Sequence, residues 1–512
     1  MSTTNGGQTN ARTPQQEQHS TIQDLVVLQR LTIDQLRVQP RRVQARYQVT
    51  TKSGESHETE MTFSYDNPYF DPKNIADCNL AAMMVAQVAI NYGLFFEEIV
   101  FDGPYDAADQ QFIRYMMENT AREVLVMKFL GPNEFLIPPF NQLKVAQRER
   151  YTAASIRFIN SDYPEYKPLK EEEPTDQHKY AILSSGGKDS LLTYGLVQEL
   201  GEAHPVFVNE SGRHWFTAVN AYRYFREHEP NTAKPWTNCD RVFNWMLRFF
   251  PFIKPNYQRI RADIYPIRMY TVAVFLFAVL PVARKRKVGN VLIGNEYDTT
   301  MRGLQEGISH YYGLYDQSKY FDNALTRYYK QKGWQMRQYS LLRSLSELLI
   351  LKVLVKRYPD LQALQVSCHA AHEKEGQMKP CGNCEKCRRI IGMLTALDED
   401  PRRCGYTSEQ IERGLKALSE KSVKQIGSDA AHLYHLLVEG GHLPVNEHTK
   451  RLAKQHPEIM NLRFDQERSR LDDLPAHILE PLFKIYESYA EGTVEREDRK
   501  WKPTNFSDLA QK

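Results

Sequence analysis

The chain has 512 residues, with 66 basic and 63 acidic side chains, so its formal net charge is only +3. A charge this small excludes a general electrostatic attraction to nucleic acid. The basic run at residues 284–287 could still contact a phosphate-bearing partner, or it could form the solvated end of a helix. The seven cysteines do not have the density of a secreted disulfide framework, so we expect a cytoplasmic protein in a reducing compartment.

No stretch of the sequence predicts a membrane anchor. The most apolar run, residues 270–283, is shorter than the roughly 20 residues that cross a bilayer, and we expect a buried helix there. Residues 1–20 are rich in Gln, Thr, Asn and Gly and have no apolar core. This composition predicts a disordered tail and argues against a signal peptide.

Residues 21–144 combine alternating and helical apolar patterns, which predict an N-terminal α+β domain. A hairpin turn is expected at residues 52–55. Asp102 and Asp106 follow a predicted strand, and they could line a pocket or serve as turn and cap residues. The expected strands are residues 25–28, 43–51, 58–65 and 95–101, and the expected helices are residues 75–92 and 107–127.

Residues 145–178 are rich in Arg, Lys, Glu and Pro, and this composition predicts a linker. Beyond it we expect a second, nucleotide-binding domain at residues 179–400. A helical C-terminal region is expected at residues 401–512.

The stretch from Lys179 to Ser190 predicts a phosphate-binding loop. An apolar strand at residues 180–183 leads into a Ser-Ser-Gly-Gly turn, and a helix follows. Backbone N–H groups and the positive end of the helix dipole then meet where the strand ends, and together they attract an anion. Lys188 is expected to add a mobile positive charge. A Walker A loop is excluded, because Lys188 is followed by Asp189 and no glycine lies five positions before Gly187.

Two further apolar strands, at residues 204–209 and 290–296, end in polar residues. This pattern is typical of a parallel α/β sheet, in which ligands bind at the carboxyl ends of the strands. Each of these polar residues could be a turn residue, but their shared position predicts one site, with Glu210 or Glu296 on Mg²⁺. The residues expected at this edge are Asn209, Glu210, Asn295 and Glu296.

Residues 309–334 are dense in tyrosine and polar side chains. They predict either a helix packed on the sheet or a substrate-binding segment in which Lys319 meets an anionic group. Residues 339–349 have helical spacing, which places Arg343 and Glu347 four residues apart on one helical face. Arg343 could therefore pair with Glu347 or bind a phosphate.

A second strong motif is Cys368 followed by C-x-x-C-x-x-C at Cys381, Cys384 and Cys387. Four thiolates match a closed tetrahedral zinc site, whose metal is structural. A [4Fe–4S] cluster is the competitor, but the ferredoxin run needs another cysteine after three intervening residues, and residues 389–392 contain none. Two nearby histidines could replace Cys368 as the fourth ligand, namely His369 and His372. The other cysteines are expected to be buried thiols, namely Cys78, Cys239 and Cys404.

The sequence S-G-G-x-D-S at residues 185–190 resembles the PP-loop of the ATP pyrophosphatases, which split ATP into AMP and pyrophosphate. With the downstream cysteines, it is similar to two groups of that superfamily. The MurL-type UDP-N-acetylmuramoyl-L-alanyl-L-glutamate epimerases resemble the chain from about residue 95 to residue 387, including G-G-K-D-S and residues 340–347. The QueC-type 7-cyano-7-deazaguanine synthases share the cysteine motif, but they usually carry a hydrophobic residue in place of Lys188.

The resemblance implies an α/β fold with a parallel-sheet PP-loop domain, and it implies ATP, Mg²⁺ and structural zinc as cofactors. It also implies that a small-molecule carboxylate attacks ATP and forms an acyl-adenylate. That adenylate is epimerised in the MurL-type reaction of peptidoglycan precursor synthesis and is captured by ammonia in the QueC-type reaction. The non-enzymatic alternative is an ATP-binding scaffold, for example in a nucleic-acid-modifying or defence complex.

The resemblance and the strand-end pattern together give the expected site residues. The expected ATP-binding residues are Ser184, Ser185, Gly186, Gly187, Lys188, Asp189, Ser190, Asn209, Glu210 and Asn295. The expected catalytic residues are Lys188, Asp189, Arg343, Glu296 and Lys319. The candidates for the epimerisation base are Glu296, Lys319 and His310.

Overall fold

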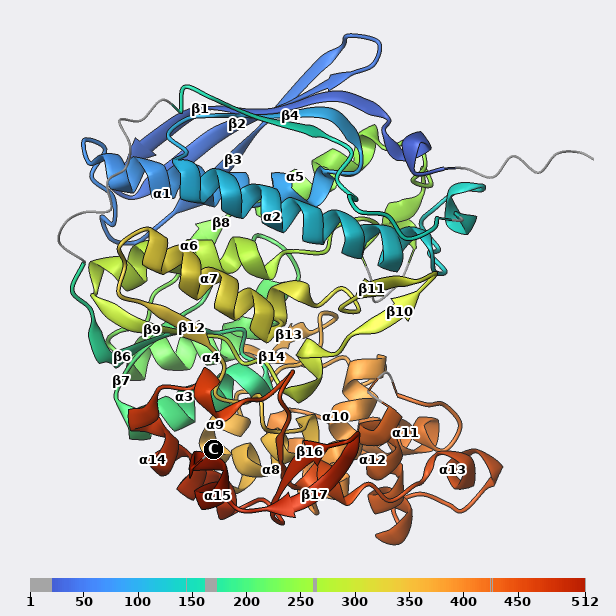
Figure 1. Ribbon diagram of the computed structural model, residues 1–512. Helices are drawn as coiled ribbons and strands as arrows, with labels where there is room; N and C mark the ends of the chain where they lie inside the picture. Colours follow the sequence, from blue (N-terminus) through green and yellow to red (C-terminus); the bar gives the residue numbers. More distant parts are fainter. Residues whose placement is uncertain are drawn as a thin grey trace, which may run out of the picture.

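The computed structural model describes residues 21–143, 145–161, 173–260, 265–423, 425 and 427–511. The predicted tail of residues 1–20 and part of the predicted linker therefore lie outside the described residues. Two β-sheets lie one above the other with helices between them, and the C-terminal region lies beyond the second sheet (Figure 1).

The first sheet consists of β1 (Leu28–Gln39), β2 (Arg42–Thr51), β3 (Ser56–Ser64), β4 (Phe96–Asp102), β5 (Ser155–Ile159) and β8 (Trp236–Thr237). Its strand order is β5-β4-β1-β2-β3-β8, and it is mixed, because β1 pairs antiparallel with β2 and parallel with β4. Alternate residues of β2 are buried, as expected for a strand with one covered face. Helices α1 (Ile75–Ala86) and α2 (Ala107–Val124) lie beneath the sheet (Figure 1).

The second sheet consists of β6 (Asp176–Leu183), β7 (Glu202–Val206), β9 (Val288–Leu292) and β12 (Arg337–Tyr339). Its order is β12-β9-β6-β7 and all of these pairings are parallel, which confirms the predicted parallel α/β sheet. Neighbouring side chains of β6 enter different cores. Ala181 belongs to the hydrophobic cluster that includes the first sheet, while Tyr180 and Ile182 belong to the cluster on the opposite face. Both faces of the second sheet are therefore buried, as is usual for parallel sheets.

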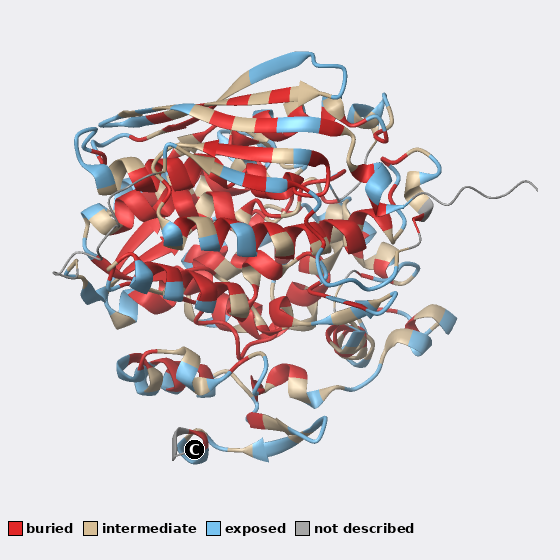
Figure 2. Ribbon diagram, turned by 45° about the horizontal axis from the view of Figure 1, so that its top comes forward, coloured by how far each residue is buried: buried red, intermediate tan, exposed pale blue. Residues whose placement is uncertain are grey.

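Helices cover both faces of the second sheet. On the side of the first sheet lie α6 (Val272–Lys285) and α7 (Lys319–Gln331), and α6 confirms the predicted buried helix. On the other side lie α3 (Lys188–Leu200), α4 (His214–His228) and α8 (Glu347–Arg357). The helices between the two sheets are mostly buried, with exposed residues on their outer faces (Figure 2). The phosphate-loop segment thus begins on a strand that is fixed from both sides.

The remaining elements are mostly short. Outside the C-terminal region they are α5 (Cys239–Met246), β10 (Gly303–Gln305), β11 (Ile308–His310), α9 (Pro359–Gln362), β13 (His372–Lys374), β14 (Gln377–Lys379) and α10 (Glu385–Ala396). From residue 401 on they are α11 (Ser408–Leu418), α12 (Gly427–Glu439), α13 (Glu447–Leu452), β15 (Leu462–Phe464), α14 (Ala476–Glu487), β16 (Thr493–Glu497), β17 (Lys500–Thr504) and α15 (Phe506–Gln511). The region predicted as helical therefore also contains a three-stranded sheet, β15-β16-β17. The domain boundaries stay a prediction.

Several predicted elements in the first half of the chain were wrong in place or type. Residues 25–28 are not a strand, because Ile22–Leu25 form a 3₁₀ turn in which Asp24 accepts a hydrogen bond from the Thr21 N–H at 2.6 Å, and the strand begins only at Leu28. Part of the predicted linker, residues 155–159, is β5 of the first sheet. The helix predicted at residues 75–92 is α1 followed by a separate 3₁₀ turn, Ala89–Tyr92.

Two predicted helices in the second half were also wrong. Residues 309–334 begin with β11, which forms a hairpin with β10, and only the second part is helix α7. Residues 339–349 are not one helix, because β12 ends at Tyr339 and α8 begins at Glu347, with a turn between them. Ser346 caps α8 by accepting a hydrogen bond from the Leu349 N–H at 3.0 Å, which sets the start of the helix.

Candidate functional site

The predicted phosphate loop connects the carboxyl end of β6 to the start of α3. β6 ends at Leu183, Gly187 is the N-cap, and α3 begins at Lys188, so the first N–H groups of α3 have no acceptor within the helix. Ser190 Oγ accepts a hydrogen bond from the Ser185 N–H at 3.2 Å and closes the loop on itself. The result is a compact turn of backbone N–H groups at a strand end, an arrangement suited to an anion.

Gly186 has a positive φ of 73° and lies against the first turn of α4. A Cβ atom at this position would be 2.4 Å from the carbonyl oxygen of Thr217. The Thr217 hydroxyl also donates a hydrogen bond to the Ser185 carbonyl at 3.1 Å. The loop is therefore packed between the sheet and α4, and only glycine fits at position 186.

Gly186→Ala should lower the free energy of unfolding by about 2–4 kcal/mol, because it adds a backbone clash to the strain of a positive φ. Gly54→Ala is the matched control, since Gly54 has a φ of 88° with no atom within 4 Å of a Cβ. It should cost only about 1 kcal/mol. Urea unfolding of both variants measures the difference, and equal losses would contradict the close packing of the loop on α4.

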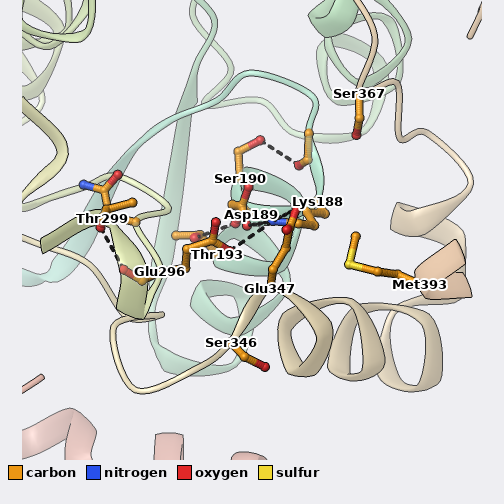
Figure 3. A network of polar contacts seen from close by, with 12 residues as sticks. Lys188, Asp189, Ser190, Thr193, Glu296, Thr299, Ser346, Glu347, Ser367 and Met393 are labelled. Atoms are coloured by element: carbon orange, nitrogen blue, oxygen red, sulfur yellow. Dashed lines mark hydrogen bonds and ion pairs between the residues drawn. The ribbon is translucent and has the colours of Figure 1, made fainter. Parts of the chain in front are cut away.

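Lys188 is not the mobile cation expected from the sequence. Its side chain is only 6% exposed, and its ammonium contacts Asp189 Oδ1 at 2.6 Å, Glu296 Oε2 at 3.2 Å and Glu347 Oε1 at 3.4 Å. Figure 3 shows the ammonium among these three carboxylates. Three acidic groups, from the start of α3, the segment after β9 and the start of α8, thus hold the lysine beneath the loop.

The electrostatics of this cluster keep Lys188 charged. Burial alone would lower the pKa of Lys188, but the carboxylates of Asp189, Glu296 and Glu347 hold it above its ordinary value. Burial raises the pKa of Glu296 well above its ordinary value, although Lys188 opposes this. Burial would also raise the pKa of Glu347, but Lys188 and Arg389 hold it below its ordinary value. Of the two glutamates, Glu296 therefore binds a proton more readily.

The segment that follows β9 lies directly beside the phosphate loop. A Cβ at Gly294 would lie 2.8 Å from Asp189 Cβ, so the two strand ends are in contact, as the sequence predicts. The Asn295 N–H donates a hydrogen bond to Ser340 Oγ at 3.0 Å. Asn295 is buried, and its side-chain Nδ2 has no hydrogen-bond partner among the described residues. It is the one predicted strand-end amide that is buried at this edge.

Arg343 and Lys319 both contact this segment, but protein groups already neutralise them. Arg343 is buried, donates to the hydroxyls of Thr299 at 3.2 Å and Thr300 at 3.1 Å, and forms an ion pair with Asp322. The predicted pairing of Arg343 with Glu347 is therefore wrong, because the two residues do not share a helix. Lys319 lies 3.2 Å from Asp473 Oδ2. The catalytic roles of both cations stay predictions.

Asn209 and Glu210 lie beyond the end of β7, in the loop that leads to α4. Asn209 Oδ1 accepts a hydrogen bond from the Ser211 N–H at 3.0 Å. Glu210 Oε1 accepts one from the Trp215 N–H at 3.1 Å, and burial raises the pKa of Glu210. Asn209 thus binds backbone within the loop, and Glu210 binds backbone in the first turn of α4. His310 lies on β11, where its Nδ1 accepts a hydrogen bond from the Tyr312 N–H.

The four predicted metal ligands form one cluster. The sulfur atoms of Cys368, Cys381, Cys384 and Cys387 all lie within 4.8 Å of one another. The Cys368–Cys384, Cys384–Cys387 and Cys381–Cys387 sulfur distances are 3.6, 3.5 and 3.8 Å. Zn–S bonds of about 2.3 Å in a tetrahedron require sulfurs about 3.8 Å apart, so the cluster could bind zinc.

The structure favours Cys368 over the two nearby histidines as the fourth metal ligand. Cys368 belongs to the cluster, whereas His369 contacts Lys386 and the ring of His214, and His372 is exposed on β13. The cysteines outside the cluster are buried at positions 239 and 404, and Cys78 is only partly buried.

Two further sequence features have a structural role. In the basic run at residues 284–287, Arg284 pairs with Glu173 and Arg286 donates to the Asn231 carbonyl, so both side chains bind protein groups.

Glu347 is the site residue that sequence reasoning missed. The Ser-Glu pair at residues 346–347, with serine as a cap and an acid in the first turn, was the available signal.

In the described parts of the chain, no helix combines the length and apolarity needed to cross a bilayer. No protein-family model matches the sequence, and no curated protein matches it either.

Proposed function

We propose that the protein is an ATP pyrophosphatase that binds the phosphates of ATP at residues 184–190 and transfers AMP to a substrate carboxylate. The observation that carries this proposal is the glycine turn between β6 and α3, at the carboxyl edge of a parallel sheet. Helix N-termini at such edges are the usual phosphate sites of α/β proteins.

In the proposed reaction, a carboxylate oxygen of the substrate attacks the α-phosphorus of ATP. The bond from the α-phosphorus to the bridging oxygen breaks, and pyrophosphate leaves with the bonding electrons. The first N–H groups of α3, with Ser185 and Ser190, would hold phosphate oxygens, and the helix dipole would stabilise the developing charge. Asp189 is the most exposed acid around Lys188, at 31% of its side chain against 17% for Glu296, so it is the carboxylate best placed for Mg²⁺.

The sequence similarity favours the terminal glutamate of UDP-N-acetylmuramoyl-L-alanyl-L-glutamate as the substrate carboxylate. Adenylation would acidify the α-hydrogen, and a base would then invert that centre. Among the three candidate bases, Glu296 is the one that contacts Lys188. The four-cysteine cluster favours the QueC-type reaction as a second candidate, in which ammonia attacks the adenylate and AMP leaves.

The test is a product assay with ATP, Mg²⁺ and the UDP-linked dipeptide. We expect AMP and pyrophosphate from the native protein and at least a hundredfold less from Asp189→Ala, since losing one group that stabilises charge costs about 10²–10³ in rate. Asp360→Ala is the control, because Asp360 is an exposed aspartate on α9. Formation of ADP would contradict the PP-loop assignment. Tight ATP binding without AMP from any carboxylate would favour the scaffold alternative.

A further inference from the structure

We propose that helix α10, which follows the cysteine cluster, positions the loop at residues 184–190 through a chain of ion pairs in which Glu347 is the central, positioning residue. This chain joins Arg389 of α10 to Glu347, and Glu347 to Lys188 of α3. The contacts themselves do not depend on ATP binding, but their consequence for ATP rests on the proposed function.

Glu347 connects two cations through one oxygen atom. Its Oε1 lies 3.4 Å from Lys188 Nζ and 3.5 Å from Arg389 Nε. Its other oxygen accepts a hydrogen bond from Gln425 Nε2 at 2.6 Å. The Glu347 side chain is 9% exposed, so water can hardly replace its ion pairs and its hydrogen bond. A carboxylate held on both oxygens has one position, and it fixes that of the ammonium.

The backbone around Glu347 is also held in place. Glu347 is the first residue of α8, and the Ser346 hydroxyl that caps the helix donates a hydrogen bond to the Ile459 carbonyl at 2.6 Å. Figure 3 shows Ser346 and Glu347 at the start of their helix, with the Glu347 side chain directed at Lys188. The carboxylate is therefore attached to a fixed point of the core.

Arg389 connects Glu347 to the cysteine cluster. Cys384 is the N-cap of α10 and Cys387 lies in its first turn, so the cluster determines where this helix starts. Arg389 follows Cys387 by two residues. The next turn packs into the core shared with α3 and α8 through Ile390 and Ile391. The helix that carries the cluster and the helix that follows the phosphate loop thus each bring a cation to the same carboxylate oxygen.

At the loop, Lys188 connects Glu347 to the first turn of α3. Its ammonium lies 2.6 Å from Asp189 Oδ1, and both residues follow the glycine turn directly. Removing the charge of Glu347 leaves Lys188 with Asp189 and Glu296 only. Because removing one partner of a buried ion pair leaves the other charge uncompensated, we expect the start of α3 to open more often without Glu347.

Hydrogen exchange of the backbone amides of Ser185 and Leu191 tests this chain in the full-length, metal-loaded protein, because these N–H groups donate to Ser190 Oγ at 3.2 Å and to the Gly187 carbonyl at 3.1 Å. We expect Glu347→Gln and Arg389→Met to exchange at least about tenfold faster there than the native protein. The amides of β2 in the first sheet, which lie far from the cluster, should keep their rates. Arg389→Lys restores a cation and should return exchange to within about threefold of native, a difference below 1 kcal/mol.

Glu399→Gln is the matched control. Glu399 is 10% exposed and lies three residues beyond α10, where it pairs with Lys356 of α8 at 2.5 Å and with Arg403 at 3.0 Å and, within the described part of the chain, forms no ion pair with Lys188. It should leave exchange at the Ser185 and Leu191 amides unchanged. Equal acceleration in Glu399→Gln and Glu347→Gln, or none in either, would overturn the proposal. Because exchange is measured without ATP, this result is independent of whether the protein cleaves ATP.

Discussion

Replacing Cys387 by serine should remove the bound metal and destabilise the segment from Cys368 to α10. Cys387 is buried, and its sulfur contacts those of Cys381 and Cys384. The β13–β14 hairpin between the ligands has mostly exposed residues, so it has little core of its own. Zinc binding supplies about 10–16 kcal/mol to small zinc-binding peptides at neutral pH, and loss of one ligand should forfeit a large part of such a contribution here. We expect a fall in the melting temperature.

Metal analysis and thermal unfolding of the same preparations measure this effect. The native protein should hold about one zinc per chain, as expected for a four-cysteine site, and Cys387→Ser should hold almost none. Cys78→Ser is the control, because Cys78 lies on α1 outside the cluster. It should keep both zinc and melting temperature. Iron in the native protein, or normal zinc in Cys387→Ser, would contradict the proposed zinc site.

The sequence predicts the parallel sheet and the loop well because both depend on local patterns. An apolar run followed by serine and glycine can be recognised from neighbouring residues alone. The strand β6 and the helix α3 lie where this pattern predicts them. The cysteine cluster is also local for three of its ligands, since Cys381, Cys384 and Cys387 share one turn and the start of α10. Short-range spacing is sufficient for these features.

The environment of Lys188 could not be predicted, because its partners come from distant parts of the chain. Glu296 is 108 residues away in sequence. Glu347 reaches Lys188 only because a turn breaks the predicted helix, and apolar spacing does not reveal that turn. For the same reason β5 and β8 were missed. Each pairs with a strand far from it in sequence, and β8 has only two residues. Tertiary contacts decide such elements, and propensity does not.

Lys332→Met should strongly destabilise the layer between the two sheets, with a loss of about 3–5 kcal/mol in the free energy of unfolding. Lys332 is 1% exposed at the end of α7. Its ammonium binds Asn79 Oδ1 at 2.6 Å and Asp109 Oδ1 at 3.1 Å, and it forms an ion pair with Asp106. Asp106 and Asp109 begin α2, so this lysine joins α7 to both helices beneath the first sheet. Methionine keeps the volume but leaves two buried carboxylates without their cation.

The loss should depend on pH in a defined direction. Burial raises the pKa of Asp109 to about 6 even with Lys332 present. Burial would also raise the pKa of Asp106, but Lys332 holds it below its ordinary value. Without the lysine both pKa values rise, so the folded variant binds more protons than the unfolded chain, and its stability falls as pH increases. Urea unfolding should therefore show a larger deficit at pH 8 than at pH 5. Lys330→Met, an exposed lysine on the same helix, should show almost no deficit at either pH. A deficit that is the same at both pH values would mean that lost packing causes it and that the carboxylates do not.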